Sequence, residues 1–87
     1  MYQKIVRALG KLYEQKKLHV TLVKSGKKEV LSAGEIEIFV NNKKTRMYFI
    51  SVNDKETIVS EEDIAAILYK ELKNCDDIIF EDMLIKQ

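Results

Sequence analysis

The stretch of sequence that decides the fold runs from Glu35 to Val52 and reads EIEIFVNNKKTRMYFISV. In its first six residues the aliphatic residues Ile36, Ile38 and Val40 alternate with Glu35, Glu37 and Phe39, which is the period of a β-strand. We expect the inward-facing residues to be Ile36, Ile38 and Val40, and the outward-facing ones to be Glu35 and Glu37. Residues 41–44 predict a tight turn because Asn tolerates positive φ angles. Residues 46–52 are apolar on both faces and predict a well-covered strand.

The segments before this hairpin predict one more strand. Residues 18–24 alternate, and residues 25–28 form a turn. Residues 29–33 fit no clear pattern, and Gly34 suits either a bulge or a bend. Three consecutive strands joined by tight turns predict an antiparallel meander.

Two amphipathic helices flank the predicted strands. Residues 3–17 place their apolar side chains on one arc and their basic side chains opposite. Ser60 is a suitable N-cap, and three acidic residues follow it, so a second helix is expected from there to about Asn74. Residues 53–56 are expected to end the pairing of strands, and residues 78–85 to form a closing strand or a short helix. The prediction is one α+β domain over residues 1–87, in the order α-β-β-β-α plus the closing element, with both helices on one sheet face.

This order resembles that of double-stranded-RNA-binding domains, which grip phosphates with a basic cluster at the start of the second helix. Ser60-Glu61-Glu62-Asp63 stand at that position here and would repel phosphates. The order of elements therefore implies nothing about function.

The composition is that of one globular domain. Of the 87 residues, 46% are apolar and 33% are charged, which disfavours disorder. Charged residues interrupt every apolar stretch near the N-terminus, and no uncharged run approaches the ~20 residues of a membrane span. Cys75 is the only cysteine, so an intrachain disulfide is excluded and a reducing, cytoplasmic location is expected.

Charge is distributed unevenly along the chain. Residues 1–49 hold eleven basic and four acidic residues, and residues 50–87 hold four basic and ten acidic residues. Because the first helix leads directly into the first strand, its end should lie near the 41–46 hairpin and create one basic end. The candidates there for contact with a nucleic-acid backbone are Lys16, Lys17, Asn42, Lys43, Lys44 and Arg46.

A second set of residues predicts a protein interface. If both helices cover one sheet face, some of the large apolar residues Phe39, Met47 and Phe49 remain on the open side, unless the closing element covers them. An uncovered patch of this kind marks a protein interface or a dimer contact. The acidic candidates for protein binding are Glu61, Glu62, Asp76, Asp77, Glu81 and Asp82.

The residues needed for catalysis are not grouped in the sequence. His19 is the only histidine. Cys75 follows a predicted helix C-terminus and precedes two Asp residues, and this negative electrostatic environment should raise the pKa of its thiol. Two potential Cys or His ligands cannot complete a zinc site, and the three Gly residues are isolated. An enzyme would need a pocket in which His19 or the Glu35/Glu37 pair faces a second titratable group.

The sequence therefore predicts a non-enzymatic protein-binding module, such as a small accessory, inhibitor or immunity-type protein, with no cofactor and no metal. Its partner is expected to be another protein or a second copy. The alternative is a nucleic-acid-binding module that uses the basic end.

Overall fold

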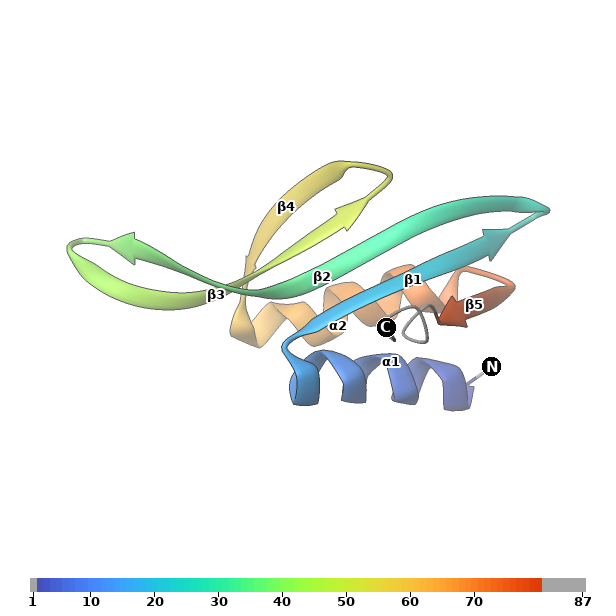
Figure 1. The fold of residues 1–87 in the computed structure, drawn as a ribbon, viewed down its shortest axis with the longest axis horizontal. Helices are drawn as coiled ribbons and strands as arrows, with labels where there is room; N and C mark the ends of the chain where they lie inside the picture. The colour runs from blue at the N-terminus through green and yellow to red at the C-terminus, as the bar shows by residue number, and fades with distance from the viewer. Residues whose placement is uncertain (1, 81–87) are drawn as a thin grey trace, which may run out of the picture.

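The computed structural model describes residues 2–80, which form a five-stranded sheet with two helices on one side (Figure 1). The sheet order is β4-β3-β2-β1-β5, and every neighbouring pair is antiparallel. In chain order the elements are α1 (Tyr2–Gln15), β1 (Lys17–Lys24), β2 (Lys27–Val40), β3 (Lys43–Val52), β4 (Lys55–Ser60), α2 (Glu61–Lys73) and β5 (Asp77–Phe80).

The predicted α+β class is confirmed, and the predicted order is confirmed in part. Three sequential strands do form an antiparallel meander, but β4 extends it to four strands before α2. With four strands between the two helices, the order of elements no longer matches that of double-stranded-RNA-binding domains. Within the predicted closing element, residues 77–80 form a strand that pairs with β1, and residues 81–85 lie outside the described part of the chain.

All three hairpin turns of the meander have the same geometry. Each has two central residues with positive φ: Ser25-Gly26, Asn41-Asn42 and Asn53-Asp54. Two-residue loops of this kind match the right-handed twist of the strands they join. The turn predicted at residues 41–44 is therefore confirmed. The prediction that residues 53–56 end the pairing was wrong, because Asn53-Asp54 is itself a hairpin turn that leads into β4.

Register decides which side chains of β2 face the helices. Leu31 and Ala33 are buried in the core beneath the helices. The pairing of β2 with β3 continues from Leu31 to Val40 without a bulge at Gly34. Because side chains alternate along a strand, Glu35, Glu37 and Phe39 share the helix-side face with Leu31. The expected orientation was therefore reversed, and the opposite face carries Ile36, Ile38 and Val40.

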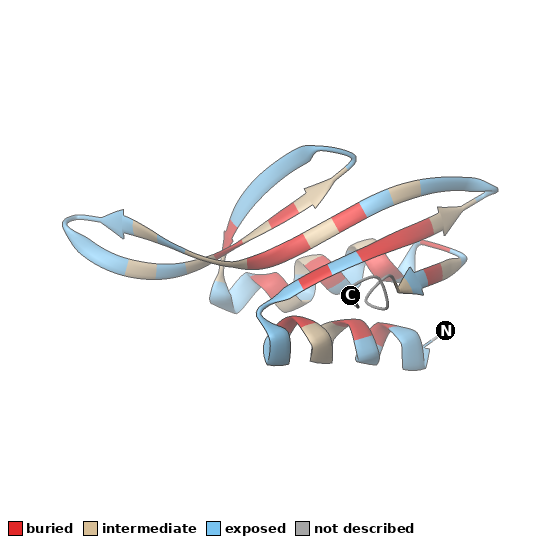
Figure 2. Ribbon diagram, viewed as in Figure 1, coloured by how far each residue is buried: buried red, intermediate tan, exposed pale blue. Residues whose placement is uncertain are grey.

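The core fills the space between the two helices and one face of the sheet, as Figure 2 shows by the buried segments that face one another. Both helices contribute to this single cluster, which confirms that they cover the same sheet face. The fully buried residues with the largest volumes are Tyr48, Leu12, Leu22, Leu31, Ile64, Leu68, Leu72, Ile78 and Val20. The predicted cap of α2 is also confirmed, since the Ser60 side chain accepts a hydrogen bond from the Asp63 N–H at 3.2 Å. In residues 2–80, neither helix has the length and apolarity that crossing a membrane would need.

Candidate functional site

The β2–β3 hairpin extends beyond the rest of the sheet. β1 begins at Lys17, which pairs with Gly34, and β4 ends at Ser60, which pairs with Met47. The intervening residues 36–46 therefore project past both neighbouring strands, at the left of Figure 1. We call residues 36–46 the arm.

The arm carries apolar side chains on both of its faces. Phe39, on the helix-side face, leaves 74% of its surface exposed, and Val40, on the opposite face, leaves 44%. Ile36 and Ile38 lie beside Val40 and are half-buried. Figure 2 shows the arm almost entirely as exposed or intermediate surface, in contrast to the buried strands above the helices.

The backbone of the arm also has hydrogen-bonding groups with which no described strand pairs. The Glu35 N–H donates to the Lys16 carbonyl at 3.1 Å, on the β1 side of β2. Because successive residues of a strand direct their backbone groups to opposite sides, Glu37 and Phe39 direct theirs to the same side as Glu35. Within residues 2–80, no strand pairs with β2 at these two positions. We call this the outer edge of β2.

The other side of the arm is the outer edge of β3. There Lys44 and Arg46 direct their backbone groups toward the β4 side, beyond the point where β4 ends at Ser60. No described strand pairs with β3 at these positions. Within residues 2–80 the arm is thus a two-stranded ribbon with no strand paired on either edge.

The basic side chains of the arm lie beside acidic ones. Arg46 Nε is 2.9 Å from Glu35 Oε2, and Arg46 Nη1 is 3.9 Å from Glu61 Oε2 at the start of α2. Lys44 Nζ is 3.7 Å from Glu37 Oε1. Exposed pairs of this kind contribute only about 0–1 kcal/mol each, but they neutralise much of the positive charge.

The six residues predicted to form one basic end do not lie together. Lys17 pairs with Gly34, six positions before the strand end at Val40, so Lys16 and Lys17 are separated from the arm's turn by about 20 Å. Asn42, Lys43 and Lys44 stand at the tip instead. The prediction of one basic end was wrong because β2 has 14 residues and β1 only 8, so the two hairpin ends do not align.

The three predicted apolar interface residues are divided between the two faces of the sheet. Met47 and Phe49 lie half-buried on the face opposite the helices, and Phe39 lies on the helix-side face. On the face with Met47, the exposed apolar residues include Val30, Ile58 and Ile79. The described part of the closing element, β5, pairs at the edge of the sheet beside β1 and does not cover this face.

The predicted acidic residues have different roles. Glu61 and Glu62 are exposed in the first turn of α2, where carboxylates complement the helix dipole. Asp76 accepts a hydrogen bond from the Ser25 N–H at 2.9 Å. Asp77 pairs with Lys4 of α1, and this contact lowers the pKa of Asp77. Glu81 and Asp82 lie outside the described residues.

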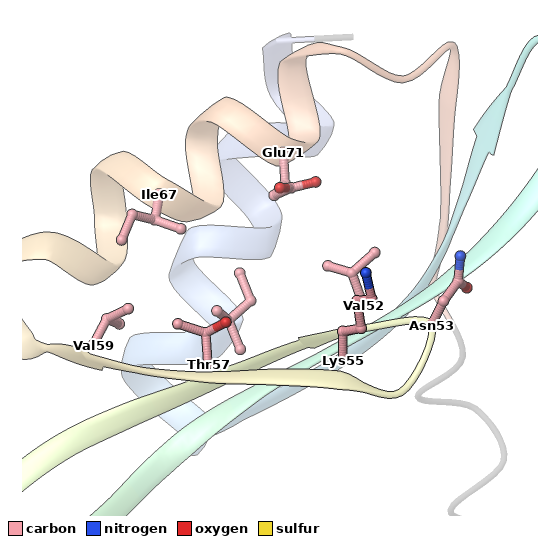
Figure 3. Close-up of a pocket in the computed structure, with 8 residues that line it drawn as sticks. Val52, Asn53, Lys55, Thr57, Val59, Ile67 and Glu71 are labelled. Carbon is pink, nitrogen blue, oxygen red and sulfur yellow. The ribbon is translucent and has the colours of Figure 1, made fainter.

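Sequence reasoning missed a groove between α2 and the β3–β4 hairpin (Figure 3). Its volume is about 450 Å³, and its lining is Ile50, Val52, Asn53, Lys55, Thr57, Val59, Ile67 and Glu71. The groove depends on β4, and the signal for β4 was the Asn53-Asp54 pair, which is a typical hairpin turn sequence. Neither His19 nor the Glu35/Glu37 pair lines this groove.

The residues considered for catalysis lie apart from one another. His19 Nδ1 is hydrogen-bonded with Ser32 Oγ at 2.8 Å on the sheet face opposite the helices. The Cys75 thiol is buried and donates to the Leu72 carbonyl at 2.9 Å. Burial is the main cause that raises the pKa of Cys75, and the Asp76 carboxylate adds a smaller effect in the same direction. Among residues 2–80, no group of three or more His, Cys, Asp or Glu side chains is arranged to hold a metal ion.

Comparison with known proteins identifies no relative, since no protein-family model, curated protein or solved structure matches this chain. The function must therefore be inferred from the residues themselves. Of the features described, the arm is the one that lies apart from the core, since none of residues 36–46 belongs to the buried cluster.

Proposed function

We propose that this chain is a non-enzymatic protein-binding module and that the arm is its contact element. The observation that supports this role is the combination of an exposed Phe39 with two strand edges on residues 36–46 that no described strand covers. An exposed apolar strand edge pairs readily with another polypeptide unless it is protected. A small accessory, inhibitor or immunity-type protein would use such an element to hold its partner.

Binding at the arm has a clear energetic basis. Each square ångström of apolar surface removed from water contributes about 25 cal/mol, and Phe39 offers a largely exposed ring. An added strand would also satisfy the backbone groups of Glu37 and Phe39 on the outer edge of β2. Strand addition of this kind draws affinity from main-chain hydrogen bonds and specificity from alternate side chains.

A nucleic-acid-binding role has less support from the same residues. Lys44 and Arg46 already lie beside carboxylates, and Lys16 and Lys17 are distant from the tip of the arm. Nucleic-acid affinity would fall with salt by about 0.9 in log K per neutralised phosphate for each unit of log salt. A protein contact at Phe39 is largely apolar and should depend much less on salt.

A capture experiment with matched variants tests the proposed role. The tagged chain is used to isolate partners from the source cell, in parallel with Phe39→Asp and Tyr2→Asp. Phe39 on the arm and Tyr2 on α1 are 74% and 71% exposed, so the two changes are equally accessible to solvent. We expect Phe39→Asp to abolish a stoichiometric protein contact, and Tyr2→Asp to leave it intact.

A stoichiometric partner that binds Phe39→Asp and the unaltered chain with equal affinity would exclude the arm as the contact element. Thermal unfolding of both variants serves as the folding control, and each should match the unaltered chain because surface changes usually alter stability by less than about 0.5 kcal/mol.

A further inference from the structure

We infer that the outer edge of β2 binds the C-terminal end of a partner polypeptide, held as an extended segment antiparallel to β2 with its terminal carboxylate beside Lys16 and Lys17. This inference deepens the proposed protein-binding role and rests on it. Three observations carry it: the point at which β1 closes this edge, the charges at that point, and the residues that the edge presents.

The outer edge of β2 is closed at one end by the start of β1. Lys17 pairs with Gly34. The Lys16 carbonyl accepts the Glu35 N–H at 3.1 Å, so the Lys16 backbone already occupies the place opposite Glu35. A segment laid along residues 36–40 is therefore in line with β1 and meets Lys16 at one end. There it must either turn out of the sheet or stop, and a chain end needs no turn.

The charges at this point favour one of the two kinds of chain end. Lys16 and Lys17 are exposed, and neither forms an ion pair with another described residue. A C-terminal carboxylate would meet two cations there, whereas an N-terminal ammonium group would be repelled by them. A segment whose C-terminus reaches Lys16 starts near the tip of the arm and runs antiparallel to β2, as β1 does.

The negative groups nearby do not cancel this preference. The carboxylates of Glu35 and Glu37 already lie beside basic residues of β3. Glu14 stands about 200° around α1 from the buried Leu12, so it is turned away from the sheet. The C-terminal end of α1 carries about half a negative charge, which the two lysines outweigh. The point at which the segment would end is therefore net positive.

The residues of the edge indicate what the partner segment contains. Glu37 and Phe39 direct their backbone groups outward, and each would exchange two hydrogen bonds with the residue opposite. Because opposite residues share a face, the ring of Phe39 favours an apolar neighbour, and Ile36 and Ile38 favour aliphatic ones on the other face. The occupant is thus an extended, mainly apolar C-terminal segment of about five residues.

A selection from peptides with free C-termini tests this inference. The probe is a library of random sequences fused to the C-terminus of a phage coat protein, and the tagged chain is the bait. We expect the enriched sequences to be rich in aliphatic and aromatic residues near their ends. Each enriched peptide is then synthesised with an acetylated N-terminus, once as the free acid and once as the C-terminal amide.

The free acid should bind at least about threefold more tightly than the amide, because the amide loses its attraction to two exposed cations. Titration calorimetry measures both affinities. The double variant Lys16→Met/Lys17→Met should remove the difference, and added salt should shrink it. The matched control is Lys27→Met/Lys28→Met, which changes two exposed lysines at the start of β2 and should preserve the difference. Equal affinities of acid and amide for the unaltered chain would overturn the inference.

The direction of the segment is tested with a spin label on the N-terminus of an enriched peptide. In the antiparallel arrangement this label lies near the tip of the arm, so it should broaden the NMR amide signals of Asn42 and Lys43 more than that of Lys17. The reverse pattern would show a parallel segment and would also overturn the inference.

The use of the outer edge of β2 is tested with a pair of proline variants. Glu37→Pro removes an outward N–H of this edge, and Lys44→Pro removes an outward N–H from the edge of β3. We expect Glu37→Pro to weaken peptide binding at least about tenfold and Lys44→Pro to leave it unchanged. Thermal unfolding of both variants is the folding control. An equal effect of the two variants on binding would exclude the edge of β2 as the site.

The outcomes separate this inference from the proposed function. If the selection enriches no peptide with a free C-terminus, the capture of a chain end is overturned. If the chain still loses a protein partner through Phe39→Asp, the arm remains a protein-binding element that uses another part of its partner. If it loses none, the proposed function is overturned as well.

Discussion

Gly34 and Phe49 are cross-strand partners, and the Phe49 ring lies across the position that a Gly34 side chain would occupy. A Cβ atom built on Gly34 would stand 2.8 Å from Phe49 Cε1 and 3.3 Å from the Lys16 carbonyl oxygen. This contact lies beside the first residue of β1, two residues before the arm begins. The absence of a side chain at position 34 therefore allows an aromatic ring to cover the root of the arm.

Gly34→Ala should destabilise the fold by about 1–3 kcal/mol, because the new methyl group overlaps the Phe49 ring. Urea unfolding monitored by circular dichroism measures the change. The cost should fall in a Phe49→Val background, where the ring is absent, and a double-mutant cycle reports this coupling.

Gly10→Ala is the matched control for this prediction. Gly10 lies in α1, and a Cβ atom there would meet nothing within 4 Å. The substitution should stabilise the chain by about 0.5–1 kcal/mol, because Ala favours the helix interior over Gly. If Gly34→Ala stabilised the chain as Gly10→Ala does, the contact between Gly34 and Phe49 would be disproved.

Ser60→Ala should lower the free energy of unfolding by about 1 kcal/mol, since it removes the side-chain acceptor of the Asp63 N–H. Ser60→Thr keeps a hydroxyl and suits the last position of β4, so it should restore most of the loss. Chemical denaturation of both variants is the measurement. Equal stabilities of the Ala and Thr variants would show that the cap does not contribute.

The ion pair between Lys4 and Asp77 joins α1 to β5 and should make stability depend on pH in the acid range. The pKa of Asp77 is lowered from its ordinary value of 3.8, with the Lys4 hydrogen bond as the main cause. A carboxylate whose pKa is lowered in the folded state stabilises the fold at pH values above its ordinary pKa. This contribution is lost as the pH falls through the lowered pKa.

Asp77→Asn should therefore lower Tm slightly at pH 7 and lose its effect at pH values below the folded-state pKa. Both side chains are about half exposed, so added salt should also shrink the difference. Asn retains the oxygen that accepts the Ile78 N–H, so the comparison isolates the charge. An Asp77→Asn effect that persists in a Lys4→Met background would contradict this ion pair.

The Cys75 thiol should react slowly in the folded protein. Burial raises the pKa of this thiol from its ordinary value of 9.0, and the thiolate is the reactive form. At pH 8 an aromatic disulfide reagent should label the native chain at least about tenfold more slowly than the chain in urea. Because the folded state disfavours the thiolate, stability should also decline as the pH rises above 9.0. Labelling at equal rates would show that Cys75 is accessible.

Local signals in the sequence determined both helices and the central turn. Ser60 with three acidic residues after it marked the start of α2, and Asn41-Asn42 marked a turn with positive φ. These predictions succeeded because caps and tight turns depend on the backbone of a few adjacent residues. The same reasoning applied to Asn53-Asp54 would have identified β4, and with it one wall of the groove.

The face of β2 that meets the helices was decided only by tertiary structure. Alternation shows that Glu35 and Ile36 point to opposite sides, but it does not show which side is covered. That choice is set by Leu31 and Ala33, which are buried under the helices. Because β2 continues to the arm without a bulge, the odd-numbered residues of the arm lie on the same face as these two. The arm itself exists because β2 and β3 extend past β1 and β4. How far neighbouring strands overlap becomes visible only when their register is known.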